Sequence, residues 1–181
     1  DKMLHHYSRV FPSVELNNTF YRFPRAAHVE QWRKATPRGF RFSIKVNRLI
    51  THTKRLRDVE ELVRVQVDRI VDLKDRAGPL LFQLPPSLRR DLVLLRDFLY
   101  ILPPVLRTVE FRHASWYDDE VYALLDEHRT ALTIMESDED HPILRFVGPF
   151  TYLRLHCSAY PANALRGWAT RIREQLARKK D

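Results

Sequence analysis

The sequence predicts an α/β fold of the TIM-type (β/α) barrel class, and three observations lead to that prediction. Short apolar segments alternate along the chain with segments of helical periodicity, which is typical of a parallel sheet with right-handed helical crossovers. Six segments resemble strands, and in each of them the polar residues fall mainly at alternate positions, here called the polar parity, which face one side of the strand. A doubly wound sheet has near-continuously apolar strands because helices cover both faces, whereas a barrel strand has one helix-facing side and one interior side.

The strand predictions rest on alternation with a period of two residues. The first strand falls within Ser13 to Pro24, where Val14 and Leu16 alternate with Glu15 and Asn17. A carboxylate in such a strand is costly to bury without a partner, so we expect a polar site beside it. The other strands are expected at Phe40–Val46, Leu80–Leu84, Arg107–His113, Thr130–Ser137 and Thr151–His156.

Between the strands, apolar residues recur at spacings of three and four residues, which indicates helices. Ser115 and Asp118 are spaced as in a capping box, so one helix is expected to start near Trp116. The whole chain, residues 1–181, is expected to form a single domain. The other helices are predicted at Asp1–Arg9, Ala27–Ala35, Asp58–Ala77, Asp91–Leu102 and Asn163–Lys179.

The number of strands bears on whether the barrel is complete. A closed barrel of this class has eight strands and usually roughly 200 residues or more, whereas this chain has 181 residues and six recognisable strands. We therefore expect the first and last barrel strands to be lacking from this chain.

Composition narrows the class of protein. The formal net charge is +8 and the sequence pI is about 9.9, which suits anionic partners such as phosphorylated metabolites or nucleic acid. An ordinary solvated surface is the alternative, because no dense basic tract accompanies the charge. A single cysteine, Cys157, excludes an intrachain disulfide and a multi-cysteine zinc site. We expect a cytoplasmic protein without a membrane segment or signal peptide.

Five motifs, in order along the chain, resemble one family. They are VELNNTFYRFP (Val14–Pro24), ITH (Ile50–His52), FQLPP (Phe82–Pro86), VEFRHASW (Val109–Trp116) and YLRLH (Tyr152–His156). Together they resemble the domain-of-unknown-function-72, or YecE-like, family over nearly the whole chain. The resemblance implies a TIM-type barrel whose opening and closing strands have no counterpart here. It supplies no reaction, because the family has no settled activity. Two positions depart from the family pattern, with Cys157 in place of the usual Gly and Glu136 in place of the usual Asp.

The polar parity of the strands supplies the candidate site residues. Glu15 and Glu110 are the candidate catalytic residues, because two carboxylates in different environments can divide the general acid and base roles. A structural interpretation is also open, with Glu15 paired to Lys45 and Glu110 paired to Arg112 or Arg154, since buried charges require partners whatever the function. The candidate substrate-binding residues are Asn17, Lys45, His52, Gln83, Arg112, Glu136, Arg154 and His156.

Residue chemistry suggests what these side chains bind. Arg112 and Arg154 suit bidentate binding of a carboxylate or phosphate. Lys45 can hold an anionic group or, with a lowered pKa, form a Schiff base. Glu110, Glu136 and His156 could together ligate a divalent metal, but the neighbouring Arg112 disfavours a cation, so no metal site is predicted. The sequence identifies no cofactor.

The sequence therefore predicts an enzyme that acts on a small anionic or polyhydroxylated substrate by acid–base chemistry. A barrel fold alone implies no activity, so two other classes remain open. One is a nucleic-acid-associated protein that uses the basic surface. The other is a barrel that binds a ligand without turnover.

Overall fold

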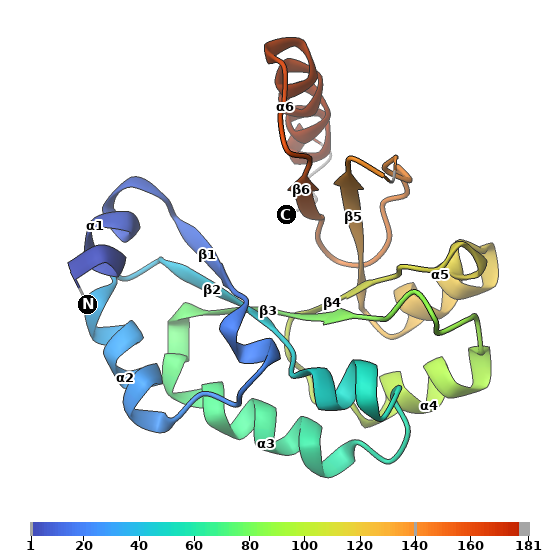
Figure 1. The fold of residues 1–181 in the computed structure, drawn as a ribbon, viewed down its shortest axis with the longest axis horizontal. Coiled ribbons are helices and arrows are strands. Elements are labelled where there is room, and N and C mark those ends of the chain that lie inside the picture. The colour runs from blue at the N-terminus through green and yellow to red at the C-terminus, as the bar shows by residue number, and fades with distance from the viewer. Residues whose placement is uncertain (1, 140, 178–181) are drawn as a thin grey trace.

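The computed structural model describes residues 2–139 and 141–177, and at its centre lies a parallel sheet of six strands. The strands lie in chain order, so each pairs with its neighbours in sequence. Figure 1 shows that β5 and β6 turn away from β1 to β4, so the sheet curls into a half-barrel. The strands are β1 (Ser13–Leu16), β2 (Arg41–Lys45), β3 (Ala77–Gln83), β4 (Arg107–Glu110), β5 (Ala131–Ser137) and β6 (Tyr152–His156).

Helices connect the successive strands from β1 through to β5, as the alternation of segments predicts, whereas the described residues between β5 and β6 form no helix. In Figure 1, α2, α3 and α4 lie side by side along one face of the sheet, α5 follows them, and α6 stands beyond β6. None of the helices among the described residues is long and apolar enough to cross a membrane. The helices are α1 (Lys2–Val10), α2 (Ala26–Ala35), α3 (Glu60–Ile70), α4 (Leu92–Ile101), α5 (Asp119–Glu127) and α6 (Ala162–Ala177).

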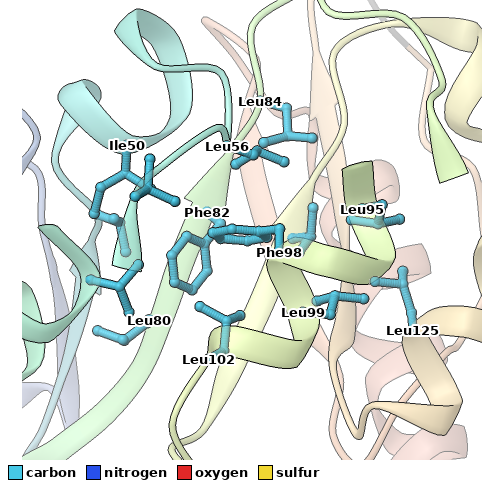
Figure 2. Packing of buried hydrophobic residues seen from close by; sticks show 14 of the residues in the cluster. Ile50, Leu56, Leu80, Phe82, Leu84, Leu95, Phe98, Leu99, Leu102 and Leu125 are labelled. Carbon is cyan, nitrogen blue, oxygen red and sulfur yellow. The ribbon is translucent and has the colours of Figure 1, made fainter. Parts of the chain in front are cut away.

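The core fills the space between the sheet and these helices. Phe82 of β3 packs edge-to-face on Phe98 of α4, with ring centroids 5.2 Å apart, and Figure 2 shows leucines of α4 and α5 around this pair. Phe82 and Phe98 are each 1% exposed. The apolar side chains of the strands therefore face the helices, and the alternate, mainly polar side chains lie on the opposite, concave face of the sheet.

A register shift between β2 and β3 sets the parity of β3. Phe42 pairs with Ala77, but Ile44 pairs with Leu80, so β3 carries one extra residue between these pairs. Gly78 lies within this bulge, where a Cβ would approach the backbone oxygen of Phe42 to 2.8 Å. The close approach of the two backbones therefore requires glycine at this position.

Three predicted segments end earlier in the structure than the sequence predicts. They are β1, β4 and α3. The first strand ends at Leu16 and is followed by a 3₁₀ turn (Asn18–Phe20), while β4 ends at Glu110 rather than at His113. The long helix predicted to Ala77 ends at Ile70, and the chain continues as the 3₁₀ segment Val71–Arg76. Lys74 there has φ 53°, a left-handed conformation that an α-helix excludes.

The start of α5 was also predicted wrongly. Ser115 belongs to a 3₁₀ turn (Ala114–Trp116), and its hydroxyl accepts a hydrogen bond from the backbone of Arg90. Asp118 caps α5 instead, accepting from the backbone N–H of Glu120. The end of the last predicted helix, at Lys179, lies outside the described residues.

Candidate functional site

The concave face of the sheet is organised around Arg154 of β6. Its guanidinium donates to both carboxylate oxygens of Glu15 on β1, with Nε to Oε2 at 2.9 Å and Nη2 to Oε1 at 2.7 Å. Its Nη1 donates to Oε2 of Glu110 on β4 at 2.6 Å. The exposed fractions of the side chains are 5% for Arg154, 19% for Glu15 and 0% for Glu110. One side chain therefore connects the first, fourth and sixth strands across the curl.

Glu110 accepts two further hydrogen bonds. Gln83 of the neighbouring β3 donates to its Oε1 at 2.7 Å, and Nε of Arg112 donates to the same oxygen at 2.5 Å. Burial by itself raises the pKa of the Glu110 carboxyl, but Arg154, Arg112 and the hydrogen bonds outweigh it, and the pKa lies below the usual value of 4.5. Glu110 is therefore held as an anion, which makes it a poor proton donor at neutral pH.

Tyr152 and Ser43 extend the network to β2. The Tyr152 hydroxyl donates to Oε2 of Glu15 at 2.8 Å and lies 2.5 Å from the hydroxyl of Ser43. Burial and the Glu15 carboxylate raise the pKa of Tyr152 above its usual value of 10.0. Neither Tyr152 nor Ser43 was among the predicted site residues, although both lie on the polar parity of their strands, which is the signal that could have found them.

Lys45, at the end of β2, lies beside this network without joining it. Its Nζ is 4.4 Å from the ring centroid of Phe20, in cation–π geometry. Lys45 makes no ion pair or side-chain hydrogen bond with the part of the chain that the structure describes. Burial and the Arg154 guanidinium lower the pKa of the Lys45 amine, against the opposing effect of Glu110 and Glu15. The predicted pairing of Glu15 with Lys45 is therefore replaced by the pairing of Glu15 with Arg154.

The histidines flank Lys45 and the network. His52, in the π-helical turn Leu49–Thr53, packs edge-on against the same Phe20 ring at 4.9 Å between centroids. Burial, then the charge of Lys45, lowers the pKa of His52. His156 ends β6 and is exposed, and partial burial together with Arg154 lowers its pKa. Phe20, which contacts both Lys45 and His52, was not among the predicted site residues.

Asn17 and Glu136 lie apart from this cluster. Asn17 follows β1 and its side chain is exposed. Glu136 lies on the other face of the sheet, where Nε1 of Trp168 on α6 donates to its Oε2 at 2.8 Å. The interior parity of β5 instead includes Thr133, whose hydroxyl lies 2.8 Å from that of Thr108. The expectation that Glu136 reaches into the interior was wrong because successive strand residues face opposite sides.

The position of Glu136 also bears on the metal alternative. Glu110, Glu136 and His156 do not converge, and no group of three or more His, Cys, Asp or Glu side chains suited to a metal ion occurs within residues 2–139 and 141–177.

The accessible groups of the site are mainly cationic donors. Arg112 donates through Nε to Glu110, and its side chain is 25% exposed, so part of it is accessible to solvent. Together with Lys45 and the two histidines, it forms the cationic rim, which we define as Lys45, His52, Arg112 and His156. Parallel-sheet sites lie at the carboxyl ends of the strands, and the cationic rim occupies this edge of β2, β4 and β6. Such an arrangement can bind an anion and exchange protons with it.

The comparison with protein families now identifies the chain. The family model described as "Protein of unknown function DUF72" matches residues 1–181. This chain belongs to the DUF72 family. Over 116 residues it is 36% identical to the UPF0759 protein YecE of Escherichia coli strain K12, covering 63% of this chain and 43% of YecE. It is 28% identical to the UPF0759 protein YunF of Bacillus subtilis strain 168 over 131 residues, which are 67% of this chain and 46% of YunF. The chain therefore spans less than half the length of the curated relatives it matches.

Two solved structures of DUF72 family proteins share the fold. The protein from Enterococcus faecalis V583 superposes with a TM-score of 0.78 and 18% identity, covering 93% of this chain and 79% of that chain. The protein from Thermotoga maritima MSB8 also gives a TM-score of 0.78, with 24% identity, covering 99% of this chain and 79% of that chain. At these identities the likeness establishes the α/β fold of this DUF72 chain and leaves its activity open.

Proposed function

We propose that this DUF72 protein binds a small anionic metabolite of the cytoplasm at the cationic rim and acts on it by acid–base chemistry. The observation that carries the proposal is the position of Lys45. Its half-buried amine has no carboxylate partner among the described residues, while the nearby arginines are fixed by Glu15 and Glu110. A half-buried cation without a counter-ion is costly unless a ligand supplies the missing charge.

The carboxylates serve this site by positioning the arginines. Glu110 accepts three hydrogen bonds and its pKa is lowered, so it stays ionised over the neutral range. Glu15 is bound through both oxygens by Arg154. We assign proton transfer to His52 and His156, whose pKa values lie below the usual 6.5 and which therefore include a neutral, proton-accepting form at pH 7.

The same proposal extends to the architecture. We infer that β1 to β6 are six consecutive strands of a TIM-type barrel, because the sheet is all-parallel, lies in chain order and curls with the polar parity inside. In such a barrel the cationic rim lies at the mouth formed by the carboxyl ends of the strands, where barrel enzymes bind their substrates.

Binding of inorganic phosphate and of glycerol 3-phosphate, measured by isothermal titration calorimetry, tests the function. Arg112→Gln removes a charge from the cationic rim and is expected to weaken binding by about ten- to a hundredfold, since a charge-assisted hydrogen bond contributes roughly 1.5–3 kcal/mol. Arg89→Gln is the matched control, because Arg89 is exposed and lies outside the rim. Equal affinities of the two variants for both anions would overturn the proposal.

A second candidate function, binding of single-stranded nucleic acid, is supported by a separate cavity. A cavity of about 450 Å³ beside the start of α2 is lined by Arg22, Arg25, His28 and Trp32, among others. Both arginines are exposed and make no ion pair with the described residues. Arginines next to an accessible aromatic ring are the features that bind phosphodiester and stack bases.

Fluorescence anisotropy with a labelled oligonucleotide separates this candidate from the first. If it holds, affinity falls steeply with salt, and Arg25→Gln weakens binding more than Arg166→Gln, which removes an exposed charge from α6. Absence of binding near physiological salt would dismiss nucleic acid and leave the small-anion proposal unchanged.

A further inference from the structure

We propose that Lys45 is an amine nucleophile that forms an imine with a carbonyl compound carrying an anionic group. The inference rests on the proposed function, because the cationic rim would hold the anionic group of the ligand. It narrows the substrate class to 2-oxo acids and phosphorylated aldehydes or ketones.

The surroundings of Lys45 differ from those of a lysine that serves only as a surface charge. Lys34 illustrates the ordinary case, since it is exposed and pairs with Glu30 one helical turn away at 2.7 Å. Lys45 is half-buried on the concave face, and its Nζ lies over the Phe20 ring. An amine nucleophile must be accessible and must be free of a carboxylate that would hold its proton. Lys45 meets both conditions within the described part of the chain.

Burial, together with the neighbouring arginines, favours the neutral amine of Lys45. Burial has the largest effect in lowering the pKa of Lys45, and Arg154 and Arg112 lower it as well, whereas Glu110 and Glu15 raise it without reversing the overall direction. The two carboxylates are already hydrogen-bonded by the arginines, so they lie near Lys45 without accepting its proton. Desolvation combined with adjacent cations is a known way of activating a lysine.

Arg112 supplies the second requirement, which is selection for an anionic carbonyl compound. Its outer guanidinium nitrogens form no ion pair or hydrogen bond with the described residues, while Nε donates to Glu110. Arg112 also contributes to the field at both Lys45 and His156. A carboxylate or phosphate bound there would carry its carbonyl group toward the amine. A neutral carbonyl compound lacks this attachment.

The chemical step needs no oxidant, reductant or metal. The lone pair of the neutral Lys45 amine forms a C–N bond to the carbonyl carbon, while the C=O π pair moves to oxygen. The nitrogen loses a proton and the oxygen gains one, which gives a carbinolamine. Protonation of the hydroxyl and loss of water then leave the protonated imine. His52, which shares the Phe20 ring with Lys45, is the candidate proton carrier.

Reductive trapping tests the inference. The protein is incubated at neutral pH with pyruvate and sodium cyanoborohydride, and the modified lysines are located by peptide mass spectrometry. We expect Lys45 to be modified about tenfold or more faster than the exposed Lys54, because its amine is activated and its carbonyl partner is bound. Acetone replaces pyruvate as the uncharged comparison and is expected to lose the preference for Lys45.

Two variants complete the design. Lys45→Arg retains the charge but cannot form an imine, so the selective adduct should disappear, whereas Lys54→Arg should leave it intact. Equal modification of Lys45 and Lys54 by pyruvate, or equal selectivity with acetone, would overturn the inference. Calorimetry with inorganic phosphate on the same samples distinguishes the two proposals. Phosphate binding without a Lys45 adduct refutes the imine alone, and absence of both refutes the anion site as well.

Discussion

At the scale of the residue, Glu110 determines whether the buried Arg154 and the partly exposed Arg112 can lie close together. Arg154 and Arg112 would repel each other if both lay near the concave face without a shared anion. Glu110, 0% exposed, accepts from both of them and from Gln83. Removing one partner of a buried pair is costly because the remaining charges lose their compensation.

Glu110→Gln is therefore expected to lower the free energy of unfolding by about 3–5 kcal/mol, the range observed when a buried ion pair is broken. Denaturation by urea at pH 7 measures it. Glu61→Gln is the control, because it removes an exposed carboxylate paired with Arg64 and should change stability little. Similar losses in the two variants would contradict the central role of Glu110.

The pH dependence of the same variant supplies a second readout. The pKa of Glu110 is lowered in the folded protein, so its contribution to stability is fully present above the usual value of 4.5 and is lost as the pH falls through the folded-state pKa. The difference in stability between the wild type and Glu110→Gln should therefore narrow on acidification below pH 4.5. A difference that stays constant into acid would show that the charge of Glu110 contributes nothing.

At the scale of the element, the bulge in β3 sets which residues face the site. A shift of one residue would exchange the faces of Phe82 and Gln83, moving the amide away from Glu110. Gly78 permits the bulge because a side chain there would meet the Phe42 backbone.

Gly78→Ala is expected to cost about 1–3 kcal/mol of stability, the usual cost of overpacking a fixed site. Gly167→Ala in α6 is the matched substitution, since its Cβ would meet only the flexible end of Arg171 at 3.3 Å. That change should be neutral or stabilising by up to about 1 kcal/mol, because alanine is the better helix former. Thermal unfolding of both variants measures the contrast, and an equal effect would refute the role of the close backbone approach.

The strands also show which side-chain positions can be predicted from the sequence and which cannot. The alternation of polar and apolar residues predicted that Glu15 and Arg154 face the interior, because this alternation is regular in β1 and β6. It failed for Glu136, since β5 carries polar residues on both faces and the sequence does not indicate which one meets α6. The position of Phe20 depends on a short 3₁₀ turn, which leaves no periodic signal.

At the scale of the whole molecule, the curl decides which charges meet. Sequence proximity suggested Lys45 as the partner of Glu15, because their strands are neighbours. Glu15 pairs instead with Arg154, 139 positions later, because β6 comes round to face β1. Pairing across a curved sheet depends on the curvature, which follows from the packing of all the helices and cannot be read from one strand.

Glu15→Gln should therefore loosen β6 more than any other strand. The substitution removes the charge that holds Arg154 and Tyr152 across the concave face. We expect faster amide hydrogen exchange in Tyr152–His156, with little change in β3, as measured by exchange mass spectrometry. Glu30→Gln, which removes only an exposed pair on α2, is the control. Uniform acceleration over the whole sheet would contradict the specific effect on β6.

The long separation between Glu15 and Arg154 has a consequence for how the candidate site assembles during folding. Neighbouring strands are closer in sequence and can pair earlier, whereas we expect the contact between Glu15 and Arg154 to close only after the intervening strands are in place. An incompletely folded chain would therefore lack the arginine arrangement, and a ligand would bind only the finished molecule. By mass action, the ligand would then protect the entire sheet against unfolding, including strands it never touches.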